Sequence, residues 1–274
     1  MKYFSKNLPR KILVVILGSV GMIYSAQAII IDDFSQGAPV LLEATNFSPA
    51  QVNLQTGLAT NSTIGGTRRV TAQTQSFARL EIDPVDGEFT FEAPSSFGYF
   101  TLDYGTESPM GIDLRADGSD AFLLNFSNVF TPGLYRGIYS LRVNGTSYDL
   151  LKDLAAGNGS RTIRIPFSKF STNATFIANQ ISLSASRVEQ SYRLILNSIV
   201  TIKTPPPLKV TMFNANEIQL SWSTNGASYI LETASAPDSA NWNPLTNSIS
   251  AGTQQFSVII PFTNTSGYFR LRNQ

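Results

Sequence analysis

The sequence of 274 residues contains no cysteine and no histidine. Without cysteine, no disulfide can brace the fold and no lipid can be attached to a processed N-terminal cysteine, so stability must come from hydrophobic cores alone. Without histidine, Ser-His-Asp and Cys-His nucleophile arrangements are excluded, as are histidine-based zinc or iron sites. The two absences remove most hydrolytic and redox mechanisms, and they favour a protein that is not an enzyme.

Charged residues are also scarce, at 14% of the chain. Disorder is not expected, because 42% of the residues are hydrophobic and 18 Phe and 10 Tyr can fill substantial cores. Abundant Ser, Thr, Asn and Gly give a surface that is polar rather than ionic, as in many extracellular β-proteins. The chain has 20 basic and 19 acidic residues and therefore no excess of positive charge of the kind that nucleic-acid-binding proteins carry. Nucleic acid is not an expected partner.

Residues 1–28 have the three parts of a secretory signal peptide. Four basic residues accompany an apolar run from Ile12 to Ile23, and Ala26-Gln27-Ala28 has the small-x-small form of a cleavage site. The alternative is an uncleaved membrane anchor, because Ile29 to Ile31 extend the apolar run. We favour cleavage, since Gln27 interrupts that run. The mature chain then keeps 16 of its 20 basic residues beside 19 acidic ones, and we expect it to be secreted or at the cell surface, outside the membrane.

Three consecutive prolines, Pro205 to Pro207, divide the rest of the chain. Prolines donate no backbone hydrogen bond and favour an extended conformation, so neither a helix nor a central strand can run through them. We therefore predict an N-terminal domain over residues 29–203, a short stiff linker over 204–208 and a smaller domain over 209–274.

Alternation of apolar and polar residues predicts that the N-terminal domain is all-β. The clearest case is Phe89 and Phe91, which alternate with Glu88, Thr90 and Glu92 and so place one strand face in a core. Turn-forming residues separate the runs at the spacing of a sandwich or barrel, and the run 192–202 is apolar on both sides in its middle. Further strands are expected at 29–31, 40–42, 65–71, 99–104, 111–115, 121–126, 140–143, 146–149, 162–167 and 192–202, with one or two edge strands between residues 43 and 64.

Two local signals refine this pattern. Asn144-Gly145 lies between two strand-like runs, where its tolerance of positive φ suits a two-residue type I′ hairpin. Only residues 149–156 can be helical, with Asp149 as the N-cap and Gly157 as the stop, and the length allows one or two turns.

The smaller domain shows the same alternation. Ile218, Leu220 and Trp222 share one face of the strand that begins at Glu217. Further strands are expected at 229–232, 256–260 and 267–272.

Three runs, at residues 111–122, 162–170 and 194–199, resemble the galactose-binding-like, or carbohydrate-binding jelly-roll, modules of bacterial secreted proteins. The resemblance covers most of residues 29–203 and consists of strand patterns. Leu220-Ser221-Trp222 and the late run around Tyr268 resemble fibronectin type III-like modules, although the segment is short for that fold. The resemblances imply an N-terminal jelly-roll β-sandwich followed by a smaller immunoglobulin/fibronectin III-like β-sandwich.

Sugar binding uses an exposed aromatic ring beside hydrogen-bonding groups, because a pyranose has an apolar face and a rim of hydroxyls. The candidate rings are Tyr99, Tyr104, Tyr135 and Tyr139. The alternative for each tyrosine is core or edge packing with its hydroxyl reaching water.

Calcium is the most plausible ion, because it prefers hard oxygen ligands from Asp side chains and backbone carbonyls. Two acidic patches provide candidate ligands, namely Asp32-Asp33, and Asp117 with Asp120. The second patch lacks the ligand spacing of an EF-hand loop, and a hairpin turn is the simpler interpretation. A structural calcium ion is thus a hypothesis that depends on these four carboxylates.

The densest acidic cluster comprises Glu81, Asp83, Asp86, Glu88 and Glu92, and two carboxylates suffice for a glycosidase. Alternation places Glu88 and Glu92 toward solvent, and residues 83–87 have the composition of a turn, so catalysis is not the favoured interpretation.

We expect a secreted, non-catalytic protein that binds an extracellular glycan or surface polymer, with the smaller domain as a spacer or protein contact. The alternatives are a structural or protein-contact component of the cell surface or matrix and, third, a carbohydrate-active hydrolase.

Overall fold

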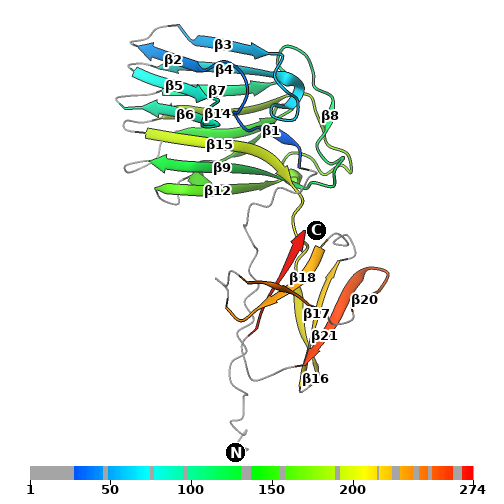
Figure 1. The fold of residues 1–274 in the computed structure, drawn as a ribbon. Coiled ribbons are helices and arrows are strands. Elements are labelled where there is room, and N and C mark those ends of the chain that lie inside the picture. Colours follow the sequence, from blue (N-terminus) through cyan, green and yellow to red (C-terminus); the bar gives the residue numbers. More distant parts are fainter. Residues whose placement is uncertain are drawn as a thin grey trace, which may run out of the picture. The chain divides into compact units, whose positions relative to one another are not determined.

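The computed structural model describes most of the chain as two compact units, of which the first ends at Thr204 and the second begins at Pro205 (Figure 1). None of the helices among the described residues is long and apolar enough to cross a membrane. The structure describes residues 28–45, 49–74, 77–94, 98–130, 137–154, 158–188, 192–214, 216–223, 229–236, 241–245, 249–261 and 267–273.

The first unit is a β-sandwich of two antiparallel sheets with jelly-roll architecture. The seven-stranded sheet has the order β12-β9-β15-β6-β5-β2, with β1 beside β15, and the six-stranded sheet has the order β11-β10-β14-β7-β4-β3 (Figure 1). The first sheet consists of β1 (Ile30–Asp32), β2 (Val40–Thr45), β5 (Phe77–Asp83), β6 (Glu88–Ala93), β9 (Ala121–Phe130), β12 (Gly159–Pro166) and β15 (Tyr192–Ile202). The second consists of β3 (Gln51–Thr56), β4 (Thr67–Thr74), β7 (Gly98–Tyr104), β10 (Ile138–Val143), β11 (Thr146–Asp149) and β14 (Ile181–Val188).

Short elements connect these strands. Asp149 caps the single helical turn, because its side chain accepts a hydrogen bond of 2.8 Å from the amide of Leu151, which confirms the predicted cap. Asn144 and Gly145 have φ values of 48° and 86°, as a type I′ turn requires, which confirms the predicted hairpin between β10 and β11. The short elements are β8 (Ile112–Asp113), β13 (Ile177–Ala178), α1 (Leu151–Leu154) and the 3-10 turns η1 (Ile64–Gly66) and η2 (Phe167–Lys169).

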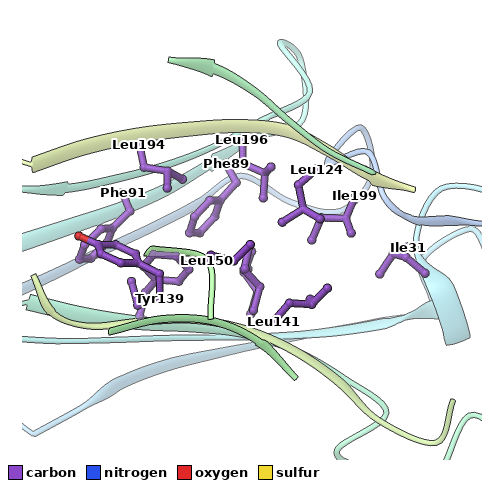
Figure 2. Close-up of a cluster of buried hydrophobic side chains, with 14 of the residues drawn as sticks. Ile31, Phe89, Phe91, Leu124, Tyr139, Leu141, Leu150, Leu194, Leu196 and Ile199 are labelled. Atoms are coloured by element: carbon purple, nitrogen blue, oxygen red, sulfur yellow. The ribbon is translucent and has the colours of Figure 1, made fainter. Parts of the chain in front are cut away.

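The core of the first unit lies between the two sheets (Figure 2). The predicted alternation in β6 is confirmed, since Phe89 and Phe91 are fully buried. Both rings contact Phe100 of the opposite sheet, with centroid distances of 5.0 and 4.8 Å. Because each strand contributes every second side chain to this layer, the other half of its side chains faces outward.

Strand β15 changes neighbours along its length. On one edge of β15, residues Tyr192 to Leu196 pair with β6, whereas Ile199 and Val200 pair with β1. On the other edge β15 pairs with β9, and the register of that pairing shifts at two places. Four consecutive residues of β15 are buried, Ser198 to Thr201, so both faces of the strand are covered there. Ile195, in the predicted middle of the strand, is only half-buried. The run covered on both faces therefore lies later than the predicted middle of the strand.

Several strand predictions changed in detail. One edge strand lies between residues 43 and 64 as predicted, since β3 ends the six-stranded sheet, and the predicted strand at 40–42 is β2, which ends the other sheet. The expected strand at 111–115 is only the two-residue β8, because Leu114 to Asp117 form a turn. Strand β14 is central in the six-stranded sheet and was not predicted.

The second unit is a smaller β-sandwich. Its sheets have the orders β16-β17-β21-β20 and β19-β18-β22 (Figure 1). The predicted face of Ile218, Leu220 and Trp222 is buried, which confirms that alternation, and it packs with Leu231 and Leu271 of the other sheet. A specific fibronectin III-like assignment stays a prediction. The strands are β16 (Lys209–Asn214), β17 (Glu217–Ser223), β18 (Tyr229–Ala234), β19 (Asn243–Pro244), β20 (Ser250–Ala251), β21 (Gln255–Pro261) and β22 (Tyr268–Asn273).

Candidate functional site

The outward side of the six-stranded sheet is the best candidate for a binding site. Alternation turns Phe100 and Leu102 of β7 into the core and leaves the intervening side chains outside, and the paired strands follow the same rule. We call this surface the polar face. Its ring and polar members are Arg69, Thr71, Gln73, Tyr99, Thr101, Asp103, Ser140, Arg142, Ser182 and Ser184. Exposed apolar side chains of the edge strand β3 and of β10 lie on the same side, namely Val52, Leu54 and Ile138.

Tyr99 is the aromatic ring of the polar face. It lies on β7 opposite Gln73 of β4, and its side chain is half-buried. Burial raises the pKa of the Tyr99 phenol above its usual value, so the hydroxyl stays protonated at neutral pH. Of the predicted tyrosines within the described residues, it is the one on a sheet surface with an amide and hydroxyl groups on the same side.

Hydroxyl and charged groups continue along the polar face from this ring. Thr101 donates a hydrogen bond of 2.8 Å to Asp103, which fixes that carboxylate on the face. The hydroxyls of Ser140 and Ser184 lie 3.0 Å apart on neighbouring strands. Arg69 lies 3.7 Å from Glu107, and both side chains are about half exposed. The polar face thus offers both donors and acceptors, with small side chains between the larger ones.

Tyr104 is not a surface platform, contrary to the prediction. It is fully buried, and its hydroxyl donates a hydrogen bond of 2.8 Å to Asp32. Burial, followed by the charge of Asp32, raises the pKa of Tyr104 well above its usual value. The reason is strand parity, because Tyr99 and Tyr104 are five positions apart on β7 and therefore point to opposite faces.

Tyr139 is also buried, so its predicted role as an exposed platform is wrong. Its ring lies in the core beside Tyr192, with centroids 5.5 Å apart, and Figure 2 shows it between the two sheets near Phe91. Tyr135 lies outside the described residues, and its predicted role stays a prediction. Of the three predicted rings that the structure describes, Tyr99 is the one on the polar face.

Asp32 does not sit in an open acidic patch. Both of its carboxylate oxygens lie 2.8 Å from Nη1 of Arg68, and both side chains are fully buried. Burial raises the pKa of Asp32, although the charge and hydrogen bonds of Arg68 oppose that shift. A carboxylate occupied by a guanidinium is unsuited to calcium, so the predicted role of Asp32 as a calcium ligand is corrected.

The other three predicted ligands accept hydrogen bonds from protein groups. Asp33 accepts from Ser35 and Ser62, Asp117 accepts from Ser119, and Asp120 accepts from Thr204. Leu114 to Asp117 form a turn, but it is not the predicted hairpin turn, because β8 pairs with β13 and β9 pairs with β12 and β15. Among the described residues, no three acidic side chains gather in the way a metal site needs. Calcium at Asp33, Asp117 and Asp120 stays a prediction.

The dense acidic cluster lies along the hairpin of β5 and β6, with Asp83 opposite Glu88, and its glutamates are bonded to basic or amide side chains. Glu81 pairs with Arg79 and Glu92 with Arg193 on the outward side of the seven-stranded sheet. Glu88 accepts a hydrogen bond of 3.1 Å from Asn197. Asp83 accepts from the amide of Val85 within a four-residue turn, as its composition predicted.

Sequence reasoning missed most of the polar face. Ser182 and Ser184 come from β14, which was not predicted, although Ile181-Ser182-Leu183-Ser184-Ala185 alternates strictly between apolar residues and serine. That alternation is the signal that could have found them. Gln73 and Asp103 have no such local signal, because only the register between β4 and β7 brings them beside Tyr99 and Arg69.

Comparisons with known proteins leave the family open. No protein-family model matches the sequence, and no curated protein matches it. One similar solved structure is the family 11 carbohydrate-binding module of Clostridium thermocellum in complex with a β-1,3-1,4-mixed-linked tetrasaccharide. It is 14% identical, with a TM-score of 0.28, over 65% of this chain and 96% of that chain.

Two further structures are similar at the same level. The solution structure of the module named CtCBM11 is 16% identical, with a TM-score of 0.29, over 66% of this chain and 98% of that chain. The glycoside hydrolase domain of Endo-D from Streptococcus pneumoniae is 10% identical, with a TM-score of 0.29, over 85% of this chain and 37% of that chain. At TM-scores this low, these neighbours carry no argument about function, which rests on the site itself.

Proposed function

We propose that the first unit binds a glycan through the polar face and carries out no chemistry on it. The observation that supports this is the position of Tyr99 on a sheet surface opposite the amide of Gln73, with hydroxyl and charged groups farther along the same strands. The half-buried ring can stack on the apolar face of a pyranose, while Gln73 donates hydrogen bonds to its hydroxyls. Arg69 lies four positions farther along β4, about 13 Å away, where it can donate to a neighbouring sugar of the same glycan. The carboxylates of Asp103 and Glu107 can accept from those hydroxyls.

A test compares ring and hydroxyl variants of Tyr99. We expect Tyr99→Ala in the full chain to weaken glycan binding by about tenfold or more, and Tyr99→Phe to weaken it much less, because the ring provides the contact. A glycan array identifies the ligand, and affinity electrophoresis in gels containing that glycan measures the change. Equal binding by the wild type and Tyr99→Ala would show that the polar face is not the glycan site. If no glycan on the array binds, the alternative of a structural component is favoured.

We also propose that the chain is exported, since residues 1–28 have the pattern of a signal peptide. Mass spectrometry of the protein purified from its natural source tests this directly. An N-terminus at Ile29 supports export with cleavage, whereas a mass that includes Ile12 to Ile23 supports the anchor.

The second candidate function is that of a structural component assembled through the second unit. Strand β16 ends its sheet, and the edge strand exposes Met212 and Phe213, with 56% and 54% of their surface accessible. Exposed apolar side chains on a strand edge favour pairing with another chain. Sedimentation velocity over a range of concentrations tests this, and we expect any self-association to be lost when both residues are changed to lysine.

A further inference from the structure

Strand β3, at the end of the six-stranded sheet, is an open edge of the first unit. Among the described residues it pairs with β4 alone, so the backbone groups along its other side have no strand partner there. Figure 1 shows β3 as the outermost strand of its sheet. Such an edge is a template for pairing with another chain unless the sequence protects it.

The sequence of β3 lacks the usual protections of an edge strand. The segment Gln51–Thr56 has six residues, no charge and no proline, and its register with β4 is regular throughout. Every other edge strand that the structure describes carries a charge or is very short. Charged residues lie in β2, β11, β12, β16 and β22, while β1, β8, β13, β19 and β20 have three residues or fewer.

The side chains of β3 also have reversed polarity. Val52 and Leu54 point outward, with 47% and 46% of their surface accessible, whereas Gln51, Asn53 and Gln55 point between the sheets. The two glutamines are hydrogen-bonded within the unit, but the Oδ1 atom of Asn53 is buried and accepts no hydrogen bond. A buried acceptor without a donor is costly, so the unit by itself satisfies neither side of this strand.

The strand is complementary to itself in one antiparallel register. When Asn53 lies opposite Asn53 of a second copy, Val52 lies opposite Leu54 on both sides of the axis, and Gln51 lies opposite Gln55. Opposite side chains of an antiparallel pair share one face, so four apolar side chains meet on the outward side and the amides meet on the inward side. The Nδ2 group of the second Asn53 can then donate to the Oδ1 atom that lacks a donor.

We propose that β3 is the interface of a two-fold homodimer, in which two copies pair edge to edge and join their six-stranded sheets into one. The occupant of the edge is a second copy because a single register matches apolar with apolar and amide with amide side chains. The contact uses the same surface on both copies, so it closes at two chains and does not extend into a fibre. Two six-residue edges bury less than the about 1,200 Å² of a standard interface, so the dimer is weak and depends on concentration.

The dimer brings two binding surfaces together. Its two-fold axis is perpendicular to the sheet, so both polar faces lie on the same side of the joined sheets. One polysaccharide can then contact both faces, and the second contact is made at a high effective concentration. This consequence rests on the proposed function, whereas the dimer itself does not.

Sedimentation velocity of the full chain tests the interface. From about 1 μM to about 500 μM, the sedimentation coefficient of the wild type should rise toward the value of a dimer. Val52→Lys combined with Leu54→Lys places two charges on each edge and should raise the dissociation constant by about tenfold or more. Because both side chains are about half exposed, the double variant should unfold at the same urea concentration as the wild type.

The exposed edge of the second unit provides a matched control. Met212 and Phe213 of β16 are about as exposed as the two residues of β3. We expect Met212→Lys combined with Phe213→Lys to leave the β3 dimer intact. The second candidate function, assembly through β16, predicts the opposite pattern for the two double variants.

The absence of cysteine from the chain makes the register itself testable. Asn53→Cys introduces a single thiol opposite its own copy, at a Cα separation of about 4.5–5.5 Å that a disulfide can span. Thr56→Cys is the matched control on the same strand, since it is exposed but lies about 20 Å from its copy in this register. Under mild oxidation, Asn53→Cys should form disulfide-linked dimers about tenfold faster than Thr56→Cys.

Three results would overturn the proposal. They are a wild type that stays monomeric over the whole concentration range, self-association that the two lysines on β3 leave unchanged, and Asn53→Cys that cross-links no faster than Thr56→Cys. The result is independent of glycan binding, because Tyr99→Ala should leave sedimentation unchanged. A monomeric wild type that still binds the array would overturn the dimer and keep the proposed function.

Discussion

Arg68 and Asp32 form an ion pair that is completely shielded from solvent, with Nη1 at 2.8 Å from both carboxylate oxygens. The pair joins β4 of the six-stranded sheet to β1 of the other sheet. The second amino group of Arg68 donates to the carbonyl oxygen of Gln36, and Gln55 accepts from the same guanidinium. Because the remaining donors are satisfied as well, the short first strand is held by polar as well as apolar contacts.

Removing the negative charge of this pair should destabilise the first unit strongly. We expect Asp32→Asn to lower the free energy of unfolding by about 3–5 kcal/mol, because it leaves a buried guanidinium without a counter-ion. Arg79→Gln is the matched control, since its pair with Glu81 is about 40% exposed and should contribute less than about 1 kcal/mol. Urea unfolding followed by circular dichroism measures both, and similar losses would contradict the argument.

Tyr104 should matter for stability and be irrelevant to glycan binding. Tyr104→Phe removes the hydroxyl that donates to Asp32 and should cost about 1–2 kcal/mol of unfolding free energy. Affinity for the glycan should stay within about twofold of the wild type, opposite to Tyr99→Ala. Loss of binding in a folded Tyr104→Phe protein would place the ligand near the buried pair instead.

Asn144 should be sensitive to its side chain as well as its backbone. Its side chain accepts from the amides of Asn179 and Gln180 and donates to the carbonyl of Ile177, while its φ is positive. Asn144→Gly keeps the turn and loses the hydrogen bonds, whereas Asn144→Ala also strains the turn. We expect the second variant to be less stable than the first by about 1 kcal/mol. Thermal unfolding compares the two, and an equal melting temperature would show that the turn conformation contributes little.

Acid should weaken the second unit through Glu232, whose buried carboxylate accepts hydrogen bonds from Arg270 and Arg272. Burial tends to raise the pKa of Glu232, but the hydrogen bonds and charges of Arg272 and Arg270 outweigh it, and the pKa in the folded state lies below its usual 4.5. The unfolded chain therefore binds more protons as the pH falls. The stabilisation is present above pH 4.5 and is lost as the pH falls through the folded pKa. Both tryptophans lie in this unit, so urea unfolding followed by their emission from about pH 6 to about pH 3 reports it. Glu232→Gln should flatten this dependence, and an unchanged slope would point to other carboxylates.

The strands and their buried faces could be predicted from the sequence wherever apolar and polar residues alternate strictly. The faces of β6 and β17 and the Asn144-Gly145 hairpin agree with the structure because each depends on local rules of parity and φ. Parity alone could also have separated Tyr99 from Tyr104, and the apolar neighbours Phe100 and Leu102 indicate which of the two is buried.

Long-range pairing could not be predicted in the same way. Asp32 looked like half of an acidic patch because its partner Arg68 is distant in sequence, and only sheet topology brings the two together. Similarly, Gln73 lies beside Tyr99 because of the register between β4 and β7, which a single sequence does not specify. Glu232 and its two arginines follow the same principle, since the pairing of β18 with β22 brings them together.

The pairing of β1 with β15 has a kinetic consequence. These are the first and last strands of the sandwich, and the hydrogen bond from the Ile29 amide to the Thr201 hydroxyl spans 172 positions of sequence. A ribosome must therefore release nearly the whole unit before the seven-stranded sheet can be completed. Chains with such high contact order fold slowly, so the nascent unit spends a long interval incompletely paired, available to chaperones and to any machinery that needs an unfolded substrate.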